Sequence, residues 1–337
     1  MKLNLIAILC ALCAWGTAAA ADPERPLDLD REDVRAFIAD VSSRHNIDPA
    51  VIRATLDQAR VQPRIIEAIS RPAEKVKPWH EYRRIFLTEE RIAAGETFWS
   101  EHRELLEQVA SGTGVPASII AGIIGVETYY GRILGRFRVI DALATLAFEY
   151  PPRSRFFAGE LEQFFLLVGE QGFDPTVPMG SYAGAMGLGQ FIPSSYRAYA
   201  VDGDGDGRVD LWGSIPDAVA SVANYLAVHG WQPDQPVVAL AVVPAGAADG
   251  LVDQGLKPTT TVGALWNAGI GMAGPAPERR GAAAGLFILE GEAGPIHWSG
   301  FDNFYVITRY NRSLMYALAV TQLGETVRDR VLVDDGA

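Results

Sequence analysis

A carboxylate lies on the apolar side of one predicted helix, and this placement limits how the chain can fold. Residues 115–131 have helical hydrophobic spacing, with Pro116 suited to the first turn and Gly131 to a left-handed cap just past the end. Ile123 and Glu127 are four residues apart, so they project from the same side of this helix. Partial burial of Glu127 on that side would raise the pKa of its carboxyl group and suit it to donating a proton near neutral pH.

A structural role for Glu127 is the alternative. A glutamate at a helix end can form an ion pair with a nearby arginine, and Arg132 and Arg136 follow closely in the chain. Perturbed carboxyl groups occur both in active sites and in structural ion pairs, so the helix alone does not separate these interpretations.

The first residues have the pattern of an export signal. Lys2 gives a basic start, residues 3–15 are almost wholly apolar, and four alanines precede Asp22. The apolar run is shorter than the roughly 20 residues that cross a bilayer. We therefore expect a cleavable signal peptide over residues 1–21 and a soluble exported product, with a retained amphipathic anchor as the alternative.

Cysteine content and charge restrict the remaining possibilities. Cys10 and Cys13 are the only cysteines, and both fall in the signal segment. The exported chain would thus be stabilised by its core or by bound metal rather than by disulfides. The formal net charge of −12 argues against nucleic-acid binding, which favours basic surfaces. It also gives no long-range attraction to an anionic polymer, so such a ligand must be held by local contacts.

The hydrophobic pattern predicts a mainly α (α+β) fold. Helical spacing dominates from residue 30 to about residue 108, a longer helix is predicted over residues 92–110, and helix returns over residues 303–330. Between them, the short apolar runs 237–243 and 286–289 are bounded by Pro, Gly and Asp, which is typical of strands. The predicted segments are a signal peptide over 1–21, an N-terminal α-helical domain over 22–100, a central core over 101–234, a small β-containing insertion over 235–303 and a C-terminal return to the core over 304–330.

An acidic loop over residues 202–217 matches the front half of an EF-hand calcium loop. Its first, third and fifth positions are aspartates, and the sixth is a glycine that permits a sharp turn. The predicted ligands at the front of the loop are Asp202, Asp204, Asp206 and the backbone carbonyl of Arg208. Position 12 is Gly213 rather than an acid, so Asp217 would have to close a longer loop. A solvated acidic turn without metal is the alternative.

Two further segments carry polar groups among small or aromatic residues. Residues 180–193 are rich in glycine and alanine and include Ser181 and Gln190, which can offer side-chain hydrogen bonds. Close backbone packing is the commoner explanation of such a segment. Residues 305–313 combine aromatic and polar side chains that could line a carbohydrate cleft. The five histidines show no zinc-ligand spacing, and the sequence contains neither a Gly-x-Ser-x-Gly elbow nor a phosphate-binding loop.

Taken together, these segments resemble the lytic murein transglycosylase B family (glycoside hydrolase family 103), in its membrane-free form in particular. The resemblance runs in order from Tyr82 to Leu323, through residues 122–128, 141–148, 181–195, 221–226 and 303–311. It implies a lysozyme-like core within residues 101–234, an α-helical domain and a small β domain. It also implies cleavage of the β-1,4 bond between N-acetylmuramic acid and N-acetylglucosamine in peptidoglycan, without water, to give 1,6-anhydromuramyl ends.

The resemblance also implies roles for individual residues. Glu127 would protonate the leaving oxygen and then act as base on the C6 hydroxyl. The residues implied to bind or shape the sugar site are Tyr82, Ser181, Gln190, Tyr310 and Asn311. The implied structural Ca²⁺ ligands are Asp202, Asp204, Asp206, Arg208 through its carbonyl, and Asp217. No catalytic cofactor is expected. The implied partners are peptidoglycan glycan strands and cell-wall synthesis or remodelling proteins, and we expect a periplasmic monomer.

Two rival functions remain at this stage. A hydrolytic muramidase would need a second carboxylate to activate water. A non-catalytic peptidoglycan-binding scaffold would keep the cleft but not the turnover. The joint presence of Glu127, Ser181, Gln190, Tyr310 and Asn311 argues against the scaffold.

Overall fold

The computed structural model describes residues 23–70, 77–253 and 255–334. The described chain forms two compact units. The first unit contains residues 77–130 and 219–334, apart from residue 254, and the second contains residues 23–70 and 131–218. The expected signal peptide lies outside the described residues.

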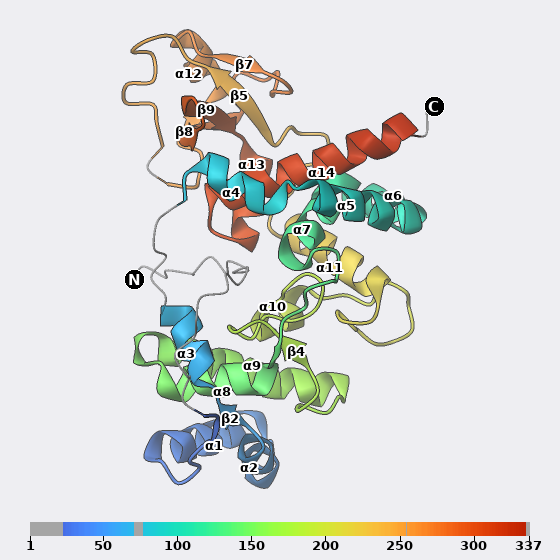
Figure 1. The fold of residues 1–337 in the computed structure, drawn as a ribbon, viewed down its shortest axis with the longest axis vertical. Coiled ribbons are helices and arrows are strands. Elements are labelled where there is room, and N and C mark those ends of the chain that lie inside the picture. The colour runs from blue at the N-terminus through green and yellow to red at the C-terminus, as the bar shows by residue number, and fades with distance from the viewer. Residues whose placement is uncertain (1–22, 71–76, 254, 335–337) are drawn as a thin grey trace. The chain divides into compact units, whose positions relative to one another are not determined.

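Helices form most of the first unit (Figure 1). They are α4 (Trp79–Phe86), α5 (Glu89–Glu101), α6 (Arg103–Thr113), α7 (Ala117–Thr128), most of α11 (Ile215–Val228), α12 (Val262–Asn267), α13 (Asp302–Tyr310) and α14 (Leu314–Asp334). Helix α14 packs against α7, α5 and α4. All residues of α7 from Ser118 to Thr128 are buried, as expected of a helix that is apolar all round.

Two glycines allow α7 and α14 to cross with their backbones in contact. A Cβ atom at Gly122 would lie 2.4 Å from the carbonyl oxygen of Val320, and one at Gly324 would lie 1.9 Å from that of Ser118. Side chains larger than hydrogen would push the helices apart, because close-packed interiors have little room to adjust. This crossing therefore depends on glycine on both helices.

Two predicted helices are interrupted in the structure. The single helix expected over residues 92–110 is wrong: His102 leaves the helical conformation (φ −124°, ψ 24°), and α6 begins at Arg103. No glycine or proline marks this break; α5 packs against α14 and α7, and α6 packs against α7. The helical return over residues 303–330 is likewise divided into α13 and α14 by Asn311 and the two residues after it.

A five-stranded antiparallel sheet lies between Val238 and Gly300 in the first unit. Its strand order is β6 (Thr260–Thr261), β8 (Ala283–Gly291), β9 (Gly294–Gly300), β5 (Val238–Val242) and β7 (Gly271–Ala273). One face of this sheet packs against α12 through a core that includes Leu286 and Leu265. Both short apolar runs expected as strands are confirmed in β5 and β8.

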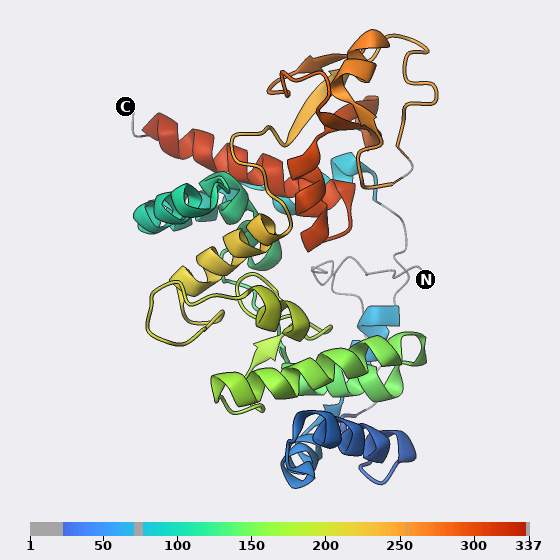
Figure 2. The same ribbon diagram turned by 180° about the vertical axis from the view of Figure 1, so that it is seen from behind.

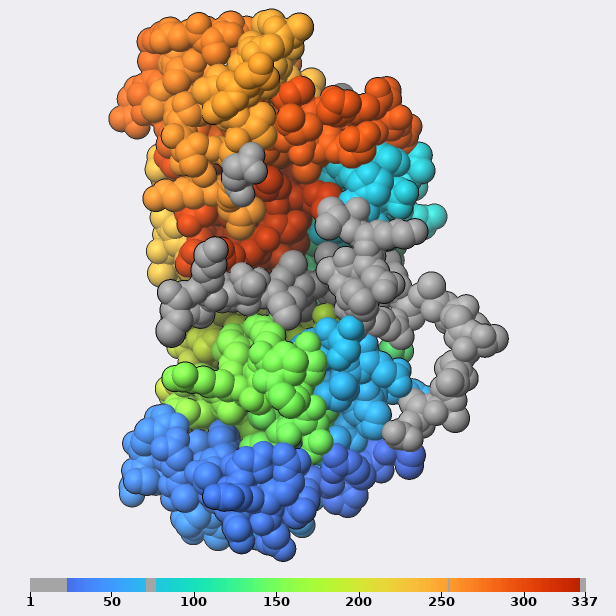
Figure 3. All heavy atoms as spheres, turned by 90° about the vertical axis from the view of Figure 1, so that its left-hand side faces the viewer, coloured from blue at the N-terminus to red at the C-terminus, as the bar shows by residue number. Residues whose placement is uncertain are grey.

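The second unit is also mainly helical. Its helices are α1 (Glu32–His45), α2 (Pro49–Asp57), α3 (Pro63–Ser70), α8 (Val139–Glu149), α9 (Ser154–Gln171), α10 (Pro193–Tyr199), the first residues of α11 and the short 3₁₀ helix η1 (Pro151–Arg153). Helix α9 packs against α8, α10 and α1, and the green and blue segments lie together in Figures 2 and 3.

Two small antiparallel ladders join loops of the second unit. Strand β1 (Arg25–Pro26) pairs with β2 (Arg60–Val61), and β3 (Phe137–Arg138) pairs with β4 (Met179–Gly180). The buried carboxylate of Asp141 connects them, because it accepts hydrogen bonds from the backbone N–H of Arg60 and from the guanidinium of Arg138. A buried carboxylate is tolerated where it is paired in this way.

The predicted mainly α class with a small β part is confirmed. The two spatial units cut across the segments 22–100 and 101–234, each of which contributes to both, so the sequence-based domain boundaries stay a prediction. Among the described helices, none is by itself long and apolar enough to cross a membrane; α6 and α7 reach that criterion only as a pair, bent by 115°.

The helix crossing gives a first testable prediction. Gly324→Ala should lower the free energy of unfolding by about 1–3 kcal/mol, because the added methyl overlaps the backbone of α7. Gly112→Ala is the matched control in α6, where no atom beyond the helix's own backbone and the adjacent residues lies within 4 Å of the added methyl. Urea denaturation of both variants checks this, with the control unchanged or stabilised by up to about 1 kcal/mol. Equal unfolding midpoints for Gly324→Ala and the wild type would contradict the crossing.

Candidate active site

The end of α7 is held in an unusual backbone conformation next to Glu127. Tyr129 and Tyr130 both have left-handed backbones, with φ values of 55° and 56°, and Gly131 follows with φ 84°. The expectation that Gly131 forms the cap is wrong, since Tyr129 occupies that position. A left-handed backbone costs a residue with a Cβ roughly 1 kcal/mol, so surrounding contacts must stabilise it.

Those contacts come from α5 and from α7 itself. A Cβ atom at Gly95 or at Gly125 would come within 2.5 Å of the Tyr130 hydroxyl, so the two glycines leave the space that its ring occupies. The guanidinium carbon of the buried Arg91 lies 4.7 Å from the centre of the Tyr129 ring, a cation–π distance. The backbone immediately after Glu127 is thus fixed by packing on both tyrosines.

Glu127 is buried in the structure, with only 6% of its surface exposed. Burial raises the pKa of its carboxyl group to about 8, because the charged form loses its hydration. The Tyr316 hydroxyl donates a hydrogen bond of 2.6 Å to Oε1 of Glu127, which favours the charged form and lowers the pKa. Burial is the larger effect, so the carboxyl group is mainly protonated at neutral pH. The predicted rise in pKa is confirmed.

Tyr316 is a residue of this site that the sequence did not reveal. It lies in the first turns of α14, 189 residues from Glu127 in the chain. Burial is the first cause that raises its pKa, and the neighbouring Glu127, Tyr310 and Tyr82 add to the rise. No local motif marks Tyr316, because its partner is supplied by the crossing of α14 with α7.

Three predicted sugar-site residues belong to the same unit as Glu127. Tyr82 lies in α4 and Tyr310 ends α13, and both are near enough to Tyr316 to affect its ionisation. Asn311 follows directly, with 7% of its surface exposed. Its Oδ1 atom is buried and accepts no hydrogen bond from the described residues. A buried acceptor of this kind is normally satisfied, so a donor from a ligand is a fitting partner.

Ser181 and Gln190 lie in the second unit, and each shapes its own loop. The Ser181 Oγ accepts hydrogen bonds from the backbone N–H groups of Ala183 and Ala185, at 3.2 and 3.1 Å. Gln190 has a left-handed backbone (φ 52°), and its Nε2 donates to the carbonyl of Gly187 at 3.0 Å. Close backbone packing and side-chain hydrogen bonding, which were alternatives for this segment, are thus both present. The approach of these two residues to Glu127 stays a prediction.

The acidic loop of the second unit brings three predicted metal ligands together. One carboxylate oxygen each from Asp202, Asp204 and Asp217 lies within 4.8 Å of the others. Asp217, in the first turn of α11, is almost fully buried and accepts hydrogen bonds from two backbone N–H groups of the loop. Asp206 is not in this cluster; its Oδ1 accepts a hydrogen bond from the backbone of Arg208.

The chemistry and spacing of this cluster fit a hard divalent cation. Calcium takes oxygen ligands at 2.3–2.6 Å, so two oxygens bound to one ion are at most about 5 Å apart. The separations in the cluster stay inside that limit. The metal-ligand roles of Asp206 and of the Arg208 carbonyl stay predictions.

Comparison with known proteins supplies the family. A family model described as "Transglycosylase SLT domain" matches residues 30–325. The chain is 41% identical to the membrane-bound lytic murein transglycosylase B of Escherichia coli over 304 residues, which cover 88% of this chain and 82% of that protein. The chain belongs to the transglycosylase SLT family. The family resemblance stated from the sequence is therefore confirmed.

Solved structures of this family share the fold. Catenated SltB1 from Pseudomonas aeruginosa has a TM-score of 0.85 at 44% identity and covers 89% of this chain and 98% of its own. Slt35 from Escherichia coli in complex with calcium has a TM-score of 0.81 at 38% identity, covering 90% and 95%. SltB3 from Pseudomonas aeruginosa, solved with NAG-anhNAM-pentapeptide, has a TM-score of 0.79 at 34% identity, covering 87% and 78%. The lysozyme-like fold of the lytic transglycosylases is confirmed.

The hydrogen bond between Tyr316 and Glu127 gives a second prediction. Tyr316→Phe should raise the pKa of Glu127 above about 8, because the donor that stabilises the carboxylate is lost. The alkaline limb of the pH profile of kcat/KM, which reports groups of the free enzyme, should move to higher pH. Carboxyl ¹³C NMR of Glu127 in both proteins measures the same pKa directly. A pKa that stays the same or falls would show that this hydrogen bond does not set it.

Proposed function

We propose that this peptidoglycan lytic transglycosylase uses Glu127 as its single catalytic acid and base. The observation that carries the proposal is the burial of Glu127 against Tyr316, which keeps the carboxyl group protonated near neutral pH. The reaction cleaves the β-1,4 bond between N-acetylmuramic acid and N-acetylglucosamine without water and leaves a 1,6-anhydromuramyl end.

Glu127 acts twice in this reaction. Its proton passes to the oxygen of the breaking glycosidic bond, so that the N-acetylglucosamine side leaves as an alcohol. The N-acetyl group of the muramyl sugar stabilises the resulting cationic centre. The carboxylate of Glu127 then removes the proton of the C6 hydroxyl as that oxygen bonds to C1. Glu127 thereby recovers the proton that it gave up in the first step, and no water is consumed.

The other buried carboxylates support this mechanism over hydrolysis, which usually needs a second carboxylate to activate water. Among the described residues, Asp141, Glu160 and Asp217 are the other buried acids, and all belong to the second unit. Asp141 pairs with Arg138, and Glu160 accepts two hydrogen bonds from Ser194. Asp217 accepts hydrogen bonds from loop N–H groups. Each of these three acids thus has a structural role in the second unit.

We assign the remaining predicted residues to sugar binding. Tyr82 and Tyr310 would shape the site around Glu127, and Asn311 would accept a hydrogen bond from the sugar through Oδ1. Ser181 would hydrogen-bond near the catalytic carboxyl, and Gln190 would contact the sugar. The backbone bonds of these last two residues hold their loop in one conformation, which supports a positioning role.

The acidic loop is proposed to bind a structural Ca²⁺ ion. Slt35 was solved with calcium, and the carboxylates of Asp202, Asp204 and Asp217 converge in this chain. Asp206 and the Arg208 carbonyl would complete the ligand set. When bound, the ion would neutralise these acidic groups and stabilise the connection between α10 and α11. The catalytic steps at Glu127 need no cofactor.

The natural substrate is proposed to be glycan strands that carry peptide stems, in the periplasm. SltB3 was solved with a disaccharide bearing a pentapeptide, which supports peptide-bearing strands as the ligand of this chain. The basic and apolar pattern of residues 1–21 supports export by a cleavable signal. A monomer that works beside cell-wall synthesis or remodelling proteins is the accompanying hypothesis.

A product analysis tests the catalytic proposal. Purified peptidoglycan is digested with the wild type, with Glu127→Gln and with Glu104→Gln, an exposed glutamate of α6 as matched control. The released fragments should be one water lighter than hydrolytic products. The rate should fall by at least about 10²-fold in Glu127→Gln, because a general acid contributes that much or more. Reducing ends would show hydrolysis, and binding without release would show a scaffold.

Calcium binding gives a separate prediction. Adding CaCl₂ should raise the Tm of the wild type, by an amount equivalent to about 2.7 kcal/mol at a concentration 100 times the Kd, and a chelator should reverse the rise. Asp217→Asn should abolish this increment, whereas Asp174→Asn, outside the loop, should keep it. A Tm that does not respond to calcium in the wild type would contradict a stabilising ion in the loop.

A further inference from the structure

Arg91 is the one buried arginine of the described residues, with 5% of its surface exposed. It lies in the first turn of α5, where Oγ of Thr88 accepts a hydrogen bond of 3.2 Å from the backbone N–H of Arg91. The family resemblance assigns it no role. A guanidinium group loses favourable hydration when it is buried, so this side chain needs compensating contacts.

Two aromatic rings from different helices provide such contacts. The guanidinium carbon of Arg91 lies 4.7 Å from the centre of the Tyr129 ring and 5.2 Å from that of the Phe86 ring. Tyr129 caps α7, and Phe86 ends α4 with 3% of its surface exposed. Both distances are typical of cation–π contacts, and the planar, weakly hydrated guanidinium group suits a buried ring face better than an ammonium group does. Arg91 thus connects α4 and α5 with the end of α7.

The end of α7 is where the backbone needs this support. Tyr129 has a left-handed backbone, with φ 55°, two residues after Glu127. The free energy of a desolvated cation–π contact is similar in size to the cost of that conformation for a residue with a Cβ atom. Arg91 is also close to Tyr130, the second left-handed residue: burial raises the pKa of the Tyr130 hydroxyl, and the charge of Arg91 opposes that rise.

Filling space does not by itself explain a charged side chain at this position. Well-packed apolar side chains of similar volume often replace buried charged groups without loss of stability. Nor does the charge act directly on the acid, because the causes that shift the pKa of Glu127 are burial and the hydrogen bond from Tyr316. The effect of Arg91 on this acid is therefore positional, through the ring that it contacts.

We propose that Arg91 is a positioning residue of the reaction, which holds Tyr129 in its left-handed conformation and so fixes the backbone that carries Glu127. The proposal rests on the proposed function, in which Glu127 transfers a proton to and from the sugar. Without this contact the last turn of α7 can relax to a less strained conformation. The carboxyl group would then leave the position from which it protonates the glycosidic oxygen, and small displacements of a catalytic group lower the rate steeply.

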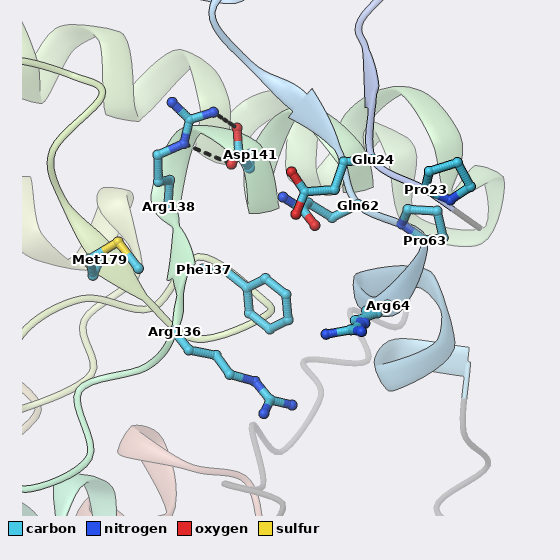
Figure 4. A pocket seen from close by; sticks show the side chains of 10 residues that line it. All are labelled: Pro23, Glu24, Gln62, Pro63, Arg64, Arg136, Phe137, Arg138, Asp141 and Met179. Atoms are coloured by element: carbon cyan, nitrogen blue, oxygen red, sulfur yellow. Dashed lines mark hydrogen bonds and ion pairs between the residues drawn. The ribbon is translucent and has the colours of Figure 1, made fainter. Parts of the chain in front are cut away.

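A double-mutant cycle in kcat tests the contact. Arg91→Met should lower kcat about tenfold, equivalent to ~1.4 kcal/mol, with KM unchanged. Glycine adopts the left-handed conformation without strain, so in a Tyr129→Gly background Arg91→Met should change kcat by less than about twofold. The control is Arg64→Met, at an exposed arginine of α3 that Figure 4 labels, and it should leave kcat unchanged. Any other pattern, such as an equal loss in both backgrounds or no loss in either, would overturn the proposal.

Variants at Tyr129 test the same contact with Arg91 in place, so they do not depend on the folding of Arg91→Met. Tyr129→Phe keeps the ring and should retain kcat within about twofold of the wild type. Tyr129→Leu loses the ring but keeps the cost of the left-handed backbone, and it should lower kcat about tenfold. Equal kcat values for these two variants would contradict a role for the ring.

The pKa of Glu127, measured by carboxyl ¹³C NMR without substrate, separates this proposal from the proposed function. Arg91→Met and Tyr129→Leu should lower it from about 8 toward its ordinary value, because a relaxed helix end admits water to the carboxyl group. Tyr129→Phe should leave it unchanged. An unchanged pKa in Arg91→Met and in Tyr129→Leu would overturn the positioning role. If both variants shift the pKa but the wild type releases no anhydro product, the proposed function alone is overturned.

Discussion

The buried contact between Glu127 and Tyr316 is the interaction on which the proposed catalytic centre depends. This contact exists because α7 and α14 cross with their backbones in contact. Such a close crossing requires glycine at positions 122 and 324. The crossing has two opposite effects on the acid: burial raises the pKa of Glu127, and the Tyr316 hydroxyl lowers it. Since burial is the larger effect, the group remains protonated near neutral pH while still having a hydrogen-bond donor that stabilises its ionised form. The proposed role of Glu127, first as acid and then as base, needs both conditions.

The strained end of α7 fits the same requirement. Tyr129 and Tyr130 adopt left-handed backbones that a glycine would adopt without strain, so packing must hold them there. Gly95 and Gly125 leave room for the Tyr130 ring, and a hydrogen-bonded turn closes the helix two residues after Thr128. The result fixes the backbone on the C-terminal side of the Glu127 carboxyl group, the proposed catalytic acid. Just after the C-terminal end of α13, the buried Oδ1 of Asn311 is an acceptor for which the described residues supply no donor.

Local sequence patterns predicted a substantial part of this arrangement. Hydrophobic period and composition can be read within a few residues, and they determine which helix side or strand is buried. The separation of four residues between Ile123 and Glu127 predicted that the acid lies on a buried side of α7. Short apolar runs predicted the strands β5 and β8. Because position 12 of the acidic loop is not an acid, the pattern predicted Asp217 as the closing ligand, and its carboxylate lies beside those of Asp202 and Asp204. Tyr316, the break at His102 and the capping of α7 by Tyr129 were not predictable in this way. Tyr316 and the α7 cap depend on contacts between helices that are distant in sequence, which local residue preferences do not encode, and the break at His102 has no glycine or proline to mark it.

The distribution of charge connects the catalytic and binding proposals. In a chain with a net charge of −12, a substrate bearing carboxylates meets an unfavourable average field, so each charged group near it must be neutralised or paired. Protonation neutralises Glu127, and a bound cation would neutralise the cluster around Asp217. Asp141 is paired with Arg138. An acidic protein can therefore act on an anionic polymer when its own buried acids are protonated, paired or neutralised by a bound cation.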